Sequence, residues 1–404
     1  MSDATGPSED VLPRGRPTLQ HLFETNPCVK VSGPMVRYSK LPARLLWRKW
    51  GCDLVYTPMF VASCFAVSQR ARDCDFTTTL PEANPADRPL IVQFAVADPQ
   101  IFVNASRIAF ANGSCDGVDI NCGCPQKWVC TDGYGSSLLE RPQDIVAMLR
   151  AARDQIPEVP VSVKIRHILA DDELKNRHNE PTRESLYRTI ELAKAVQDAG
   201  ACPSRILTHT VIYAHGDIRT RRYTHTVIYI HIIYITPNPH APCMDRASDG
   251  LLTVHGRTAK TSSSVPVCLE GIKMIKETLS IPVIANGDIF APDDVLRTQE
   301  MTGVNGVMSA RGLLQNPALY AGYNRVPAAA VQDFLDLSIQ YGLSYHLLHN
   351  HLMFMLYPVL ARAERRELAE CASLCALMDF CAAQGLWTPF ESRPAVAGVT
   401  PGML

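Results

Sequence analysis

Short apolar runs recur along this chain, and helical patterns separate them. Eight runs have the length and composition of buried strands, and most of them end in polar residues or glycine: 28–36, 53–60, 90–96, 117–122, 159–165, 251–254, 281–285 and 306–309. Strands that alternate with helices in this way are typical of a (β/α)8 barrel, the TIM barrel of the α/β class. A doubly wound parallel sheet is the rival, but no GxGxxG turn follows the first strand.

The composition changes along the chain and predicts four parts. Residues 1–27 are rich in Pro, Gly, Ser and charge, and we expect a mobile N-terminal tail. The barrel is predicted over 28–326. Over 327–387 the strand patterns stop, and helical patterns at 331–350 and 362–383 predict a small C-terminal helical domain. The last part, 388–404, contains three prolines and is expected to be a second mobile tail.

One segment does not fit the barrel pattern. Residues 202–250 stand where a helix-to-strand connection normally takes about 2–6 residues. They contain THTVIY twice, at 208–213 and 224–229, and their His, Thr, Ile and Tyr bias is typical of low complexity. This atypical insertion enters on the face opposite the strand ends, so a site there survives if the insertion loops out. If it disturbs 251–254, the barrel is impaired.

Composition and charge restrict the classes of function. A hydrophobic content of 47% and a charged content of 20% describe a globular protein. The formal net charge is -1, so binding to a nucleic acid needs a local basic surface. The 14 cysteines are scattered and the first residues lack an apolar signal region, which favours a reduced, cytoplasmic location. No run reaches the roughly 18–20 apolar residues of a membrane span, and we expect no membrane segment.

The fourth strand ends in the most informative turn. From Gly117 the sequence GVDINCGCPQ alternates like a strand and then breaks into Gly, Cys and Pro. It places Asn121, Cys122 and Cys124 at the barrel mouth, where catalytic groups of such barrels lie. Taken alone, the cysteine pair is more typical of a buried cluster. Together with Cys130 it lacks the spacing and the fourth ligand of a zinc site, and we predict no metal.

Other strand ends carry polar residues that need partners. Gln93 lies within a buried run, so its amide requires a hydrogen bond, either within the barrel or to a ligand. Lys164 lies near the end of an apolar strand, which favours a ligand at the mouth over a solvated charge. His255 ends the sixth strand. The loops after strands seven and eight commonly bind phosphate in barrels, and there Gly287 allows close backbone approach while Arg311 adds a charge.

Taken together, these motifs resemble the tRNA-dihydrouridine synthases, FMN enzymes that reduce uridine in transfer RNA. The resemblance covers about residues 28–200 and 251–385. Within the family, NCGCPQ and the helical end resemble the eukaryotic enzymes for uridines 20a and 20b of the D-loop. Seven motifs in barrel order carry it: SGPMVRYSK from Ser32, VQFA around Gln93, DINCGCPQ from Asp119, VKIR from Val163, VHGRT from Val254, IANGDI from Ile284 and ARGLLQNP from Ala310.

The resemblance implies a cofactor, a co-substrate and an acid. NADPH would supply a hydride that reaches C6 of uracil through FMN, and Cys124, the cysteine before proline, would protonate C5. Cys122 should point elsewhere, and Cys130 should be structural. Asn121 and Arg166 would contact the substrate base. FMN would be bound by Pro34, Met35, Val36, Gln93, Lys164, His255, Asn286, Gly287, Asp288, Ala310 and Arg311.

The resemblance also implies that the partner is tRNA, from which the target base must be flipped out. We expect a monomer. Two other functions stay open: a catalytically impaired tRNA-binding protein, and an FMN dehydrogenase that acts on a free pyrimidine. The basic residues that are candidates for RNA contacts lie near strand ends or in the helices beside them: Arg37, Lys40, Arg44, Lys127, Arg166, Arg257 and Lys260.

Overall fold

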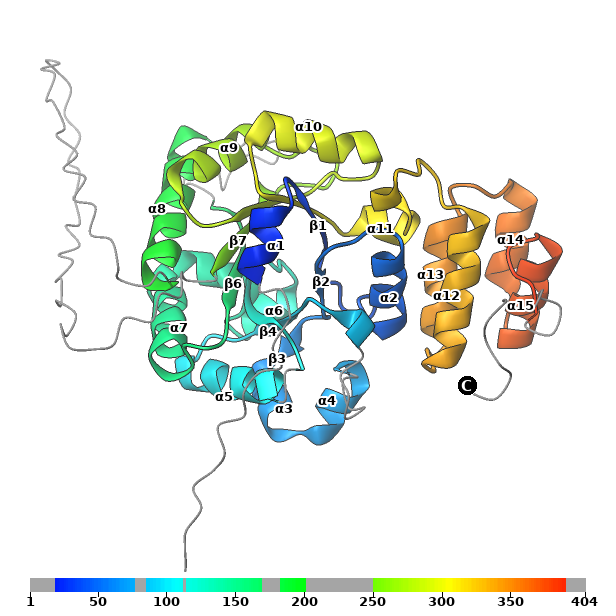
Figure 1. Cartoon of the computed structure of the whole chain (residues 1–404), viewed down its shortest axis with the longest axis horizontal. Helices are drawn as coiled ribbons and strands as arrows, with labels where there is room; N and C mark the ends of the chain where they lie inside the picture. The colour runs from blue at the N-terminus through cyan, green and yellow to red at the C-terminus, as the bar shows by residue number, and fades with distance from the viewer. Residues whose placement is uncertain (1–18, 77–84, 112–113, 169–181, 201–249, 390–404) are drawn as a thin grey trace, which may run out of the picture. The chain divides into compact units, whose positions relative to one another are not determined.

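A sheet of parallel strands forms the centre of the molecule in the computed structural model, which describes residues 19–76, 85–111, 114–168, 182–200 and 250–389 (Figure 1). The strand order is β1-β9-β8-β7-β6-β5-β4-β2, and a bridge between Val31 and Leu54 brings the two ends of the sheet together. This nearly closed barrel confirms the TIM-barrel prediction and excludes the doubly wound sheet, whose edges stay apart. The strands are β1 Val29–Ser32, β2 Val55–Tyr56, β3 Phe60–Val61, β4 Leu90–Ala95, β5 Gly117–Cys122, β6 Val161–His167, β7 Leu251–Thr258, β8 Val283–Asn286 and β9 Gly306–Ser309.

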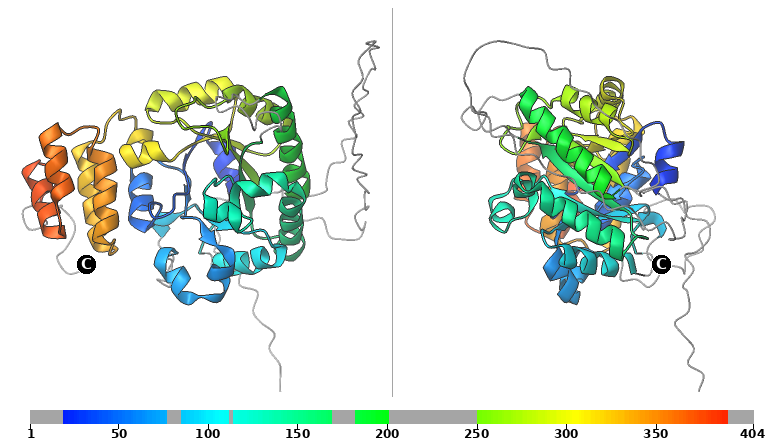
Figure 2. Two further views of the ribbon diagram at one scale, coloured as in Figure 1. Left: turned by 180° about the vertical axis from the view of Figure 1, so that it is seen from behind. Right: turned by 90° about the vertical axis from the view of Figure 1, so that its left-hand side faces the viewer.

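Helices follow the strands in the alternation that the sequence predicts (Figure 2). Four of them have a proline in the first turn, where no backbone hydrogen bond is lost, and Asp98 caps α5 by accepting the Ile101 N–H at 2.8 Å. The helices are α2 Leu41–Lys49, α3 Ala62–Val67, α4 Gln69–Asp75, α5 Pro99–Phe110, α6 Lys127–Thr131, α7 Pro142–Gln155, α8 Arg183–Gly200, α9 Leu269–Thr278, α10 Pro292–Thr302 and α11 Arg311–Gln315, with 3-10 turns at Pro85–Asp87, Gly135–Glu140 and Leu319–Ala321.

A short helix, α1 (Leu19–Thr25), packs against the interior of the barrel near the start of β5. Leu19 and Phe23 are buried there in a cluster with Val31, Tyr56 and other inward-facing strand residues. Because Leu19, Leu22 and Phe23 follow helical spacing, they form one apolar face that the barrel covers. The predicted tail over 1–27 is therefore wrong for 19–25, and residues 1–18 lie outside the described chain.

Four helices follow the barrel: α12 Ala328–Gln340, α13 Tyr345–Leu356, α14 Arg362–Glu370 and α15 Leu374–Ala383. The two helices predicted at 331–350 and 362–383 are each divided. Gly342, with a φ of 66°, lies between the first two, and Ser373 caps the last by accepting the Ala376 N–H at 3.2 Å. Helix α12 packs on α2, where Asp333 binds the ammonium of Lys49 at 2.6 Å (Figures 1 and 2).

The predicted insertion at 202–250 lies outside the described residues except for Gly250, and so does the end of the chain from 390. The elements on either side of the insertion are regular. Helix α8 ends at Gly200, and β7 pairs in register with β6 from Leu251 and with β8 from Leu252. The strand that leads to His255 is therefore intact. Within the described chain, no helix is long and apolar enough to cross a membrane.

Candidate active site

A cavity of about 350 Å³ opens at the carboxyl ends of the strands. Every residue that the sequence analysis placed in the site lines it, although these residues come from the ends of seven different strands. The structure thus brings the predicted set together at one place, as expected for a barrel. The set consists of Pro34, Met35, Val36, Gln93, Asn121, Cys124, Lys164, Arg166, His255, Asn286, Gly287, Asp288, Ala310 and Arg311.

A directional chain of hydrogen bonds lies beneath the cavity. Ser162 donates its hydroxyl to one oxygen of Asp119 at 2.5 Å, and the other oxygen accepts the Gln93 amide N–H at 2.7 Å. Because an ionised carboxylate only accepts, Gln93 turns its own oxygen toward Asn121, whose amide N–H it accepts at 2.7 Å. The Asn121 oxygen then accepts the backbone N–H of Cys124 at 2.9 Å. Asp119 therefore orients, through two amides, the turn that carries the thiol.

Asp119 is ionised at neutral pH in spite of its position. Burial raises the pKa of this carboxyl to about 6, and the hydrogen bonds from Ser162 and Gln93 oppose the shift. The polarity of the amide chain is thus set at physiological pH. Gln93 keeps one amide N–H and one lone pair free of this chain, and both are available to a ligand.

Two cations from β6 stand beside this chain. Among the described residues, the ammonium of Lys164 has no recorded hydrogen bond or ion pair, and burial followed by the charge of Arg166 lowers its pKa to about 7. Arg166 is held in place by the carbonyl oxygens of Gly123 at 2.6 Å and Thr258 at 3.1 Å. A buried ammonium without a hydrogen-bond partner favours an electron-rich ligand in the cavity.

His255 faces the cavity as a neutral imidazole. Burial, with the charges of Arg166 and Lys164, holds its pKa far below the usual range. Its Nδ1 accepts the backbone N–H of Arg257 at 3.1 Å, so the single ring proton lies on Nε2. His255 can therefore donate one hydrogen bond to a ligand but does not add a charge.

The thiol of Cys124 is partly exposed to the cavity, and burial raises its pKa above the ordinary value. It is therefore protonated at neutral pH and able to give up a proton. Cys122 is fully buried in the hydrophobic core and does not line the cavity, as predicted. Cys130 lies behind the turn, with its sulfur 3.6 Å from the carbonyl oxygen of Cys124 and 3.4 Å from the hydroxyl of Ser136.

The loops after β8 and β9 form the other end of the cavity. Arg257, which is 4% exposed, binds both oxygens of Asp288 at 2.7 and 2.5 Å. Its prediction as an RNA contact is wrong, because its charge is buried and already paired. Arg311 is about half exposed and only reaches Asp288 at 4.0 Å, so its guanidinium remains available.

Two positions at this end of the cavity have room only for glycine. Gly287 has a φ of 120°, and an added Cβ would lie 2.5 Å from the Val267 side chain. At Gly312 an added Cβ would lie 2.0 Å from the carbonyl oxygen of Ile289. Asn286 is buried and donates to the carbonyl oxygen of Met308 at 3.0 Å. Both glycines line the cavity beside Arg311, where backbone N–H groups can contact an anion.

The loop after β1, which carries Pro34, Met35 and Val36, is braced from behind. The hydroxyl of Ser39 donates to the carbonyl oxygen of Gly33 and accepts the Met35 N–H, both at 3.0 Å. These two bonds close the loop on itself. Its position relative to the barrel therefore depends on what holds Ser39.

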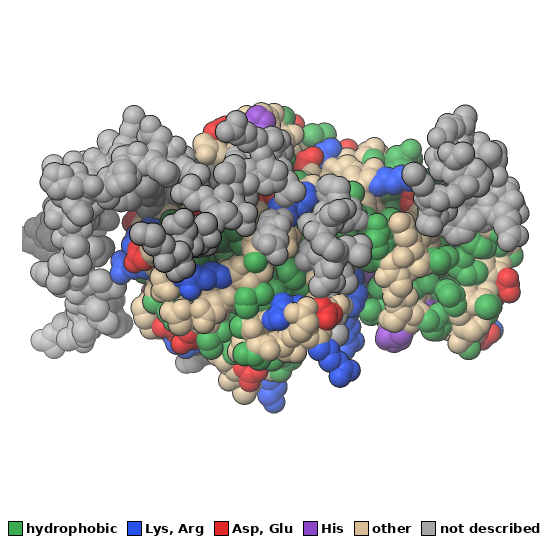
Figure 3. All heavy atoms as spheres, turned by 60° about the horizontal axis from the view of Figure 1, so that its bottom comes forward, with side chains coloured by type: hydrophobic (Ala, Val, Ile, Leu, Met, Phe, Trp, Pro, Cys, Tyr) green, Lys and Arg blue, Asp and Glu red, His purple; other side chains and the backbone are tan. Residues whose placement is uncertain are grey.

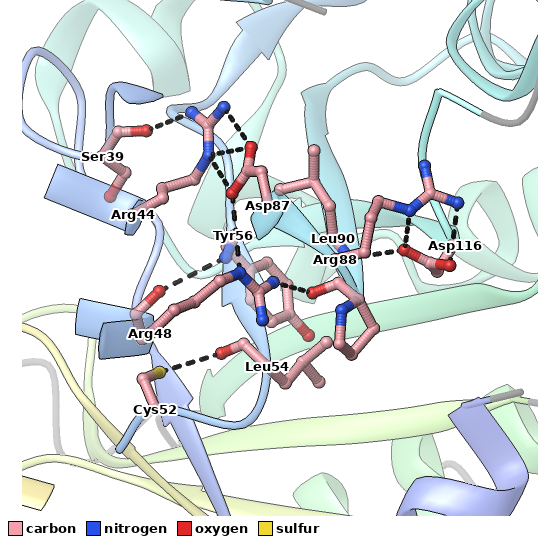
Figure 4. Close-up of polar contacts among 12 residues, drawn as sticks. Ser39, Arg44, Arg48, Cys52, Leu54, Tyr56, Asp87, Arg88, Leu90 and Asp116 are labelled. Carbon is pink, nitrogen blue, oxygen red and sulfur yellow. Dashed lines mark hydrogen bonds and ion pairs between the residues drawn. The ribbon is translucent and has the colours of Figure 1, made fainter. Parts of the chain in front are cut away.

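Arg44 holds Ser39 (Figure 4). Its Nη1 donates to the carbonyl oxygen of Ser39 at 2.8 Å, while its Nε and Nη2 bind the carboxylate of Asp87, the latter at 2.7 Å. Arg44 is fully buried and Asp87 is 2% exposed. The prediction of Arg44 as an RNA contact is therefore wrong, since helix α2 turns this side chain inward.

The same buried network continues to the start of β4 (Figure 4). Arg48 donates to the carbonyl oxygen of Pro89 and lies 3.7 Å from Asp87. Arg88 pairs with Asp116 at 2.8 Å, and Asp116 accepts the Leu90 N–H at 2.6 Å. These contacts tie α2, the turn before β4 and the turn before β5 into one support for the cavity loop.

Some cavity residues had no role in the sequence analysis. Met59, Gln126, Ile289 and Phe290 line the cavity. Gln126 and Ile289 end two of the quoted motifs but were given no role, whereas Met59 and Phe290 follow no pattern that sets them apart in the sequence. Asp119 was part of a motif but was given no function. A role for Asp119 could have been recognised from two features: its carboxylate lies in a buried strand, and it is in register with another buried polar residue, Gln93.

The sequence matches the family described as Dihydrouridine synthase (Dus) over residues 30–238 and 247–369. This chain belongs to the dihydrouridine synthase family. All the cavity residues that the sequence analysis predicted lie within the two matched ranges. The family resemblance read from the strand-end motifs is thereby confirmed.

Named relatives agree with the family. The Homo sapiens protein named tRNA-dihydrouridine(20a/20b) synthase (NAD(P)+)-like is 37% identical over 363 residues, which cover 89% of this synthase and 92% of the human protein. The tRNA-dihydrouridine(20a/20b) synthase (NAD(P)+) of Schizosaccharomyces pombe is 34% identical over 353 residues, covering 87% and 86%. Among solved structures, the crystal structure of TcOYE with pHBA aligns at a TM-score of 0.46 and 9% identity, covering 72% of this synthase and 87% of that chain, and adds nothing to the fold described above.

Proposed function

We propose that this dihydrouridine synthase reduces uridine to 5,6-dihydrouridine in the D-loop of tRNA, with FMN in the cavity and NADPH as the hydride source. The observation that carries the proposal is that a protonated thiol, Cys124, and an unpartnered ammonium, Lys164, face one cavity in a member of this family. The printed names of the relatives, which give tRNA, positions 20a/20b and NAD(P)+, support the substrate and the co-substrate.

The cavity residues fit FMN. The exposed guanidinium of Arg311, beside the cavity-lining backbone of Gly287 and Gly312, suits a phosphate. The unpaired Lys164 suits the pyrimidine edge of a flavin, because a cation there favours the reduced, anionic ring. Bound FMN would accept hydride from a nicotinamide and pass it to the uracil ring. The residues that would hold the ring beside Lys164 are Pro34, Met35, Val36, Gln93 and His255.

Cys124 supplies the proton that completes the reduction. When hydride reaches C6 of uracil, the electron pair moves to C5, and the thiol S–H bond breaks to form the new C5–H bond. The sulfur is left as a thiolate, which the charges of Arg166 and Lys164 stabilise. Because the thiol is partly exposed, water can return the proton before the next turnover. Asn121, which orients the turn, and Arg166 would contact the base.

Binding of tRNA must depend on local basic groups. The net charge is -1, and on the face drawn in Figure 3 basic side chains are interspersed with acidic and apolar ones. Of the predicted RNA contacts, Arg37, Lys127 and Lys260 are exposed and can serve. The target base would leave its stack to enter the cavity, as in other enzymes that modify a base within folded RNA. A cytoplasmic monomer remains our proposal from the sequence alone.

The test compares Cys124→Ala with Cys122→Ala in the purified full chain. Cys124→Ala should bind FMN and accept hydride from NADPH like the wild type, because neither step uses the thiol. Its dihydrouridine formation in undermodified tRNA should fall about 100- to 10,000-fold. Cys122→Ala is the matched control, since it removes a neighbouring thiol that does not face the cavity.

Three results would contradict parts of this proposal. Equal losses in both variants, or a loss only in Cys122→Ala, would remove Cys124 from its role. A wild-type chain that cannot be loaded with FMN but still binds tRNA would be the impaired binding protein. Turnover of free uracil would indicate the dehydrogenase instead.

A further inference from the structure

We propose that Trp128 is a stacking platform for an unpaired nucleotide of the tRNA next to the target uridine. The inference rests on the function proposed above and assigns a contact that lies outside the cavity. It concerns the hollow around helix α6, which follows the turn carrying Cys124 directly in the sequence.

The hollow lies beside the mouth of the cavity, and the two share one lining residue. Gln126 lines both, and it is followed by Lys127 and Trp128, which line the hollow with Thr131 and Asp132. Trp128 is 46% exposed, a large value for an aromatic side chain beside the mouth. The next residue, Val129, is fully buried and anchors the helix to the barrel. A nucleotide beside a base in the cavity would therefore lie within reach of the indole.

The indole is held in a fixed orientation. Its Nε1–H donates to the side-chain oxygen of Gln126 at 2.8 Å, so its polar edge already has a partner within the protein. What stays exposed is aromatic carbon. An aromatic surface that is ordered and has its N–H satisfied can gain little from water, but it stacks well on a base.

The neighbouring charges favour a nucleotide as the occupant. Flipping the target uridine into the cavity removes a stacking partner from the adjacent base, and Trp128 can replace that partner. Lys127 is exposed and has no ion pair recorded in the described chain, so it can meet the phosphodiester. Asp132 lines the same hollow and repels phosphate. The phosphodiester backbone of the tRNA should therefore lie on the side of Lys127.

The first experiment measures the Kd for undermodified tRNA in Trp128→Ala and Trp128→Phe. Stacking on an aromatic side chain is worth about 1–3 kcal/mol per base, so Trp128→Ala should raise the Kd about 5- to 150-fold. Trp128→Phe should raise it less, because an aromatic face remains. The control is Tyr187→Ala on α8, which removes a side chain that is 50% exposed outside the cavity lining and the hollow, and its Kd should not change. FMN content and reduction by NADPH should match the wild type in all three.

The second experiment identifies the nucleotide. A tRNA with an abasic residue beside the target uridine should bind the wild type more weakly, and Trp128→Ala should bind it no more weakly than it binds intact tRNA. The stacking proposal would be overturned if the loss of affinity from Trp128→Ala and the loss from the abasic residue added together. It would also be overturned if Trp128→Ala bound tRNA with the wild-type Kd. The hollow would then be a candidate site for a protein partner. A loss of flavin reduction in Trp128→Ala would also overturn the stacking proposal, by showing a structural effect. If the wild type makes no dihydrouridine, the proposed function is wrong. The comparison of Kd values still tests whether Trp128 stacks on a nucleotide.

Discussion

The buried pair between Arg44 and Asp87 should be essential for stability, and replacing Asp87 with Asn tests this. Arg44 is fully buried, and it makes its contacts with the Asp87 carboxylate at 3.2, 3.0 and 2.7 Å. The substitution leaves the guanidinium buried without a counter-charge. Removing one partner of such a pair costs about 3–5 kcal/mol. Asn keeps one oxygen that can accept a bond, so we expect the lower end, about 3 kcal/mol.

Urea unfolding of the full chain measures the loss. The matched control is Lys49→Ala, because Lys49 lies on the same helix and pairs with Asp333 through a side chain that is 62% exposed. An exposed pair of this kind contributes about 0–1 kcal/mol. If Asp87→Asn costs no more than Lys49→Ala, the reasoning from burial is refuted.

A double variant, Arg44→Met with Asp87→Leu, separates stability from the positioning of the cavity loop. Replacing both charges by apolar groups is often neutral, but Arg48 still loses its contact with Asp87, so the double variant should recover only part of the free energy of unfolding that Asp87→Asn loses. The bond from Arg44 to the Ser39 carbonyl oxygen is still lost, and with it the support of the loop that carries Met35. FMN retention on dilution, followed by flavin fluorescence, should therefore stay below the wild-type level. Full retention would show that the pair does not position the loop.

Two further predictions concern the proposed FMN site. Arg311→Ala should lower FMN occupancy after purification in dilute buffer, since it removes the available guanidinium beside Gly312. If the variant keeps the wild-type FMN occupancy, Arg311 does not bind the phosphate. Lys164 has a pKa of about 7, and an electron-rich ligand raises it, so FMN binding should take up close to one proton at about pH 8.5 and almost none at about pH 6. Titration calorimetry in buffers of different ionisation enthalpy measures the uptake, and Lys164→Met should abolish it.

The sequence predicted the barrel and its cavity lining well, because both depend on local patterns. An apolar run that ends in a polar turn shows where a parallel strand stops, and all such ends meet at one edge of the barrel. Even so, β7 continues through His255 to Thr258, beyond the predicted end at Val254. Hydrogen bonds with β6 and β8, which are not local, extend it.

What the sequence could not predict depends on contacts between distant residues. Arg44 looks like any helical arginine until Asp87 is placed 43 positions away beside it. The apolar face of α1 is short, and only the barrel interior gives it a surface to cover. The role of Asp119 follows from its register with Gln93, a relation between two strands. The break at Gly342 was visible as a glycine, but a glycine inside a helical pattern does not by itself end a helix.

The position of Cys124 should depend on Gly135, which lies behind it. Gly135 has a φ of 63°, and an added Cβ would lie 2.5 Å from the carbonyl oxygen of Cys124 and 2.7 Å from the Val129 side chain. In Gly135→Ala, the left-handed conformation costs about 1–2 kcal/mol and the close contacts about 1–3 kcal/mol more. Gly133→Ala is the matched control in the same turn, because its φ is 80° but its Cβ would meet only the flexible end of Arg141, at 3.2 Å. Both variants should lose stability from strain, but only Gly135→Ala should displace the thiol. Its dihydrouridine formation should fall well below that of Gly133→Ala, while FMN content and reduction by NADPH stay alike in the two. Equal dihydrouridine formation in both variants would show that the turn does not set the position of Cys124.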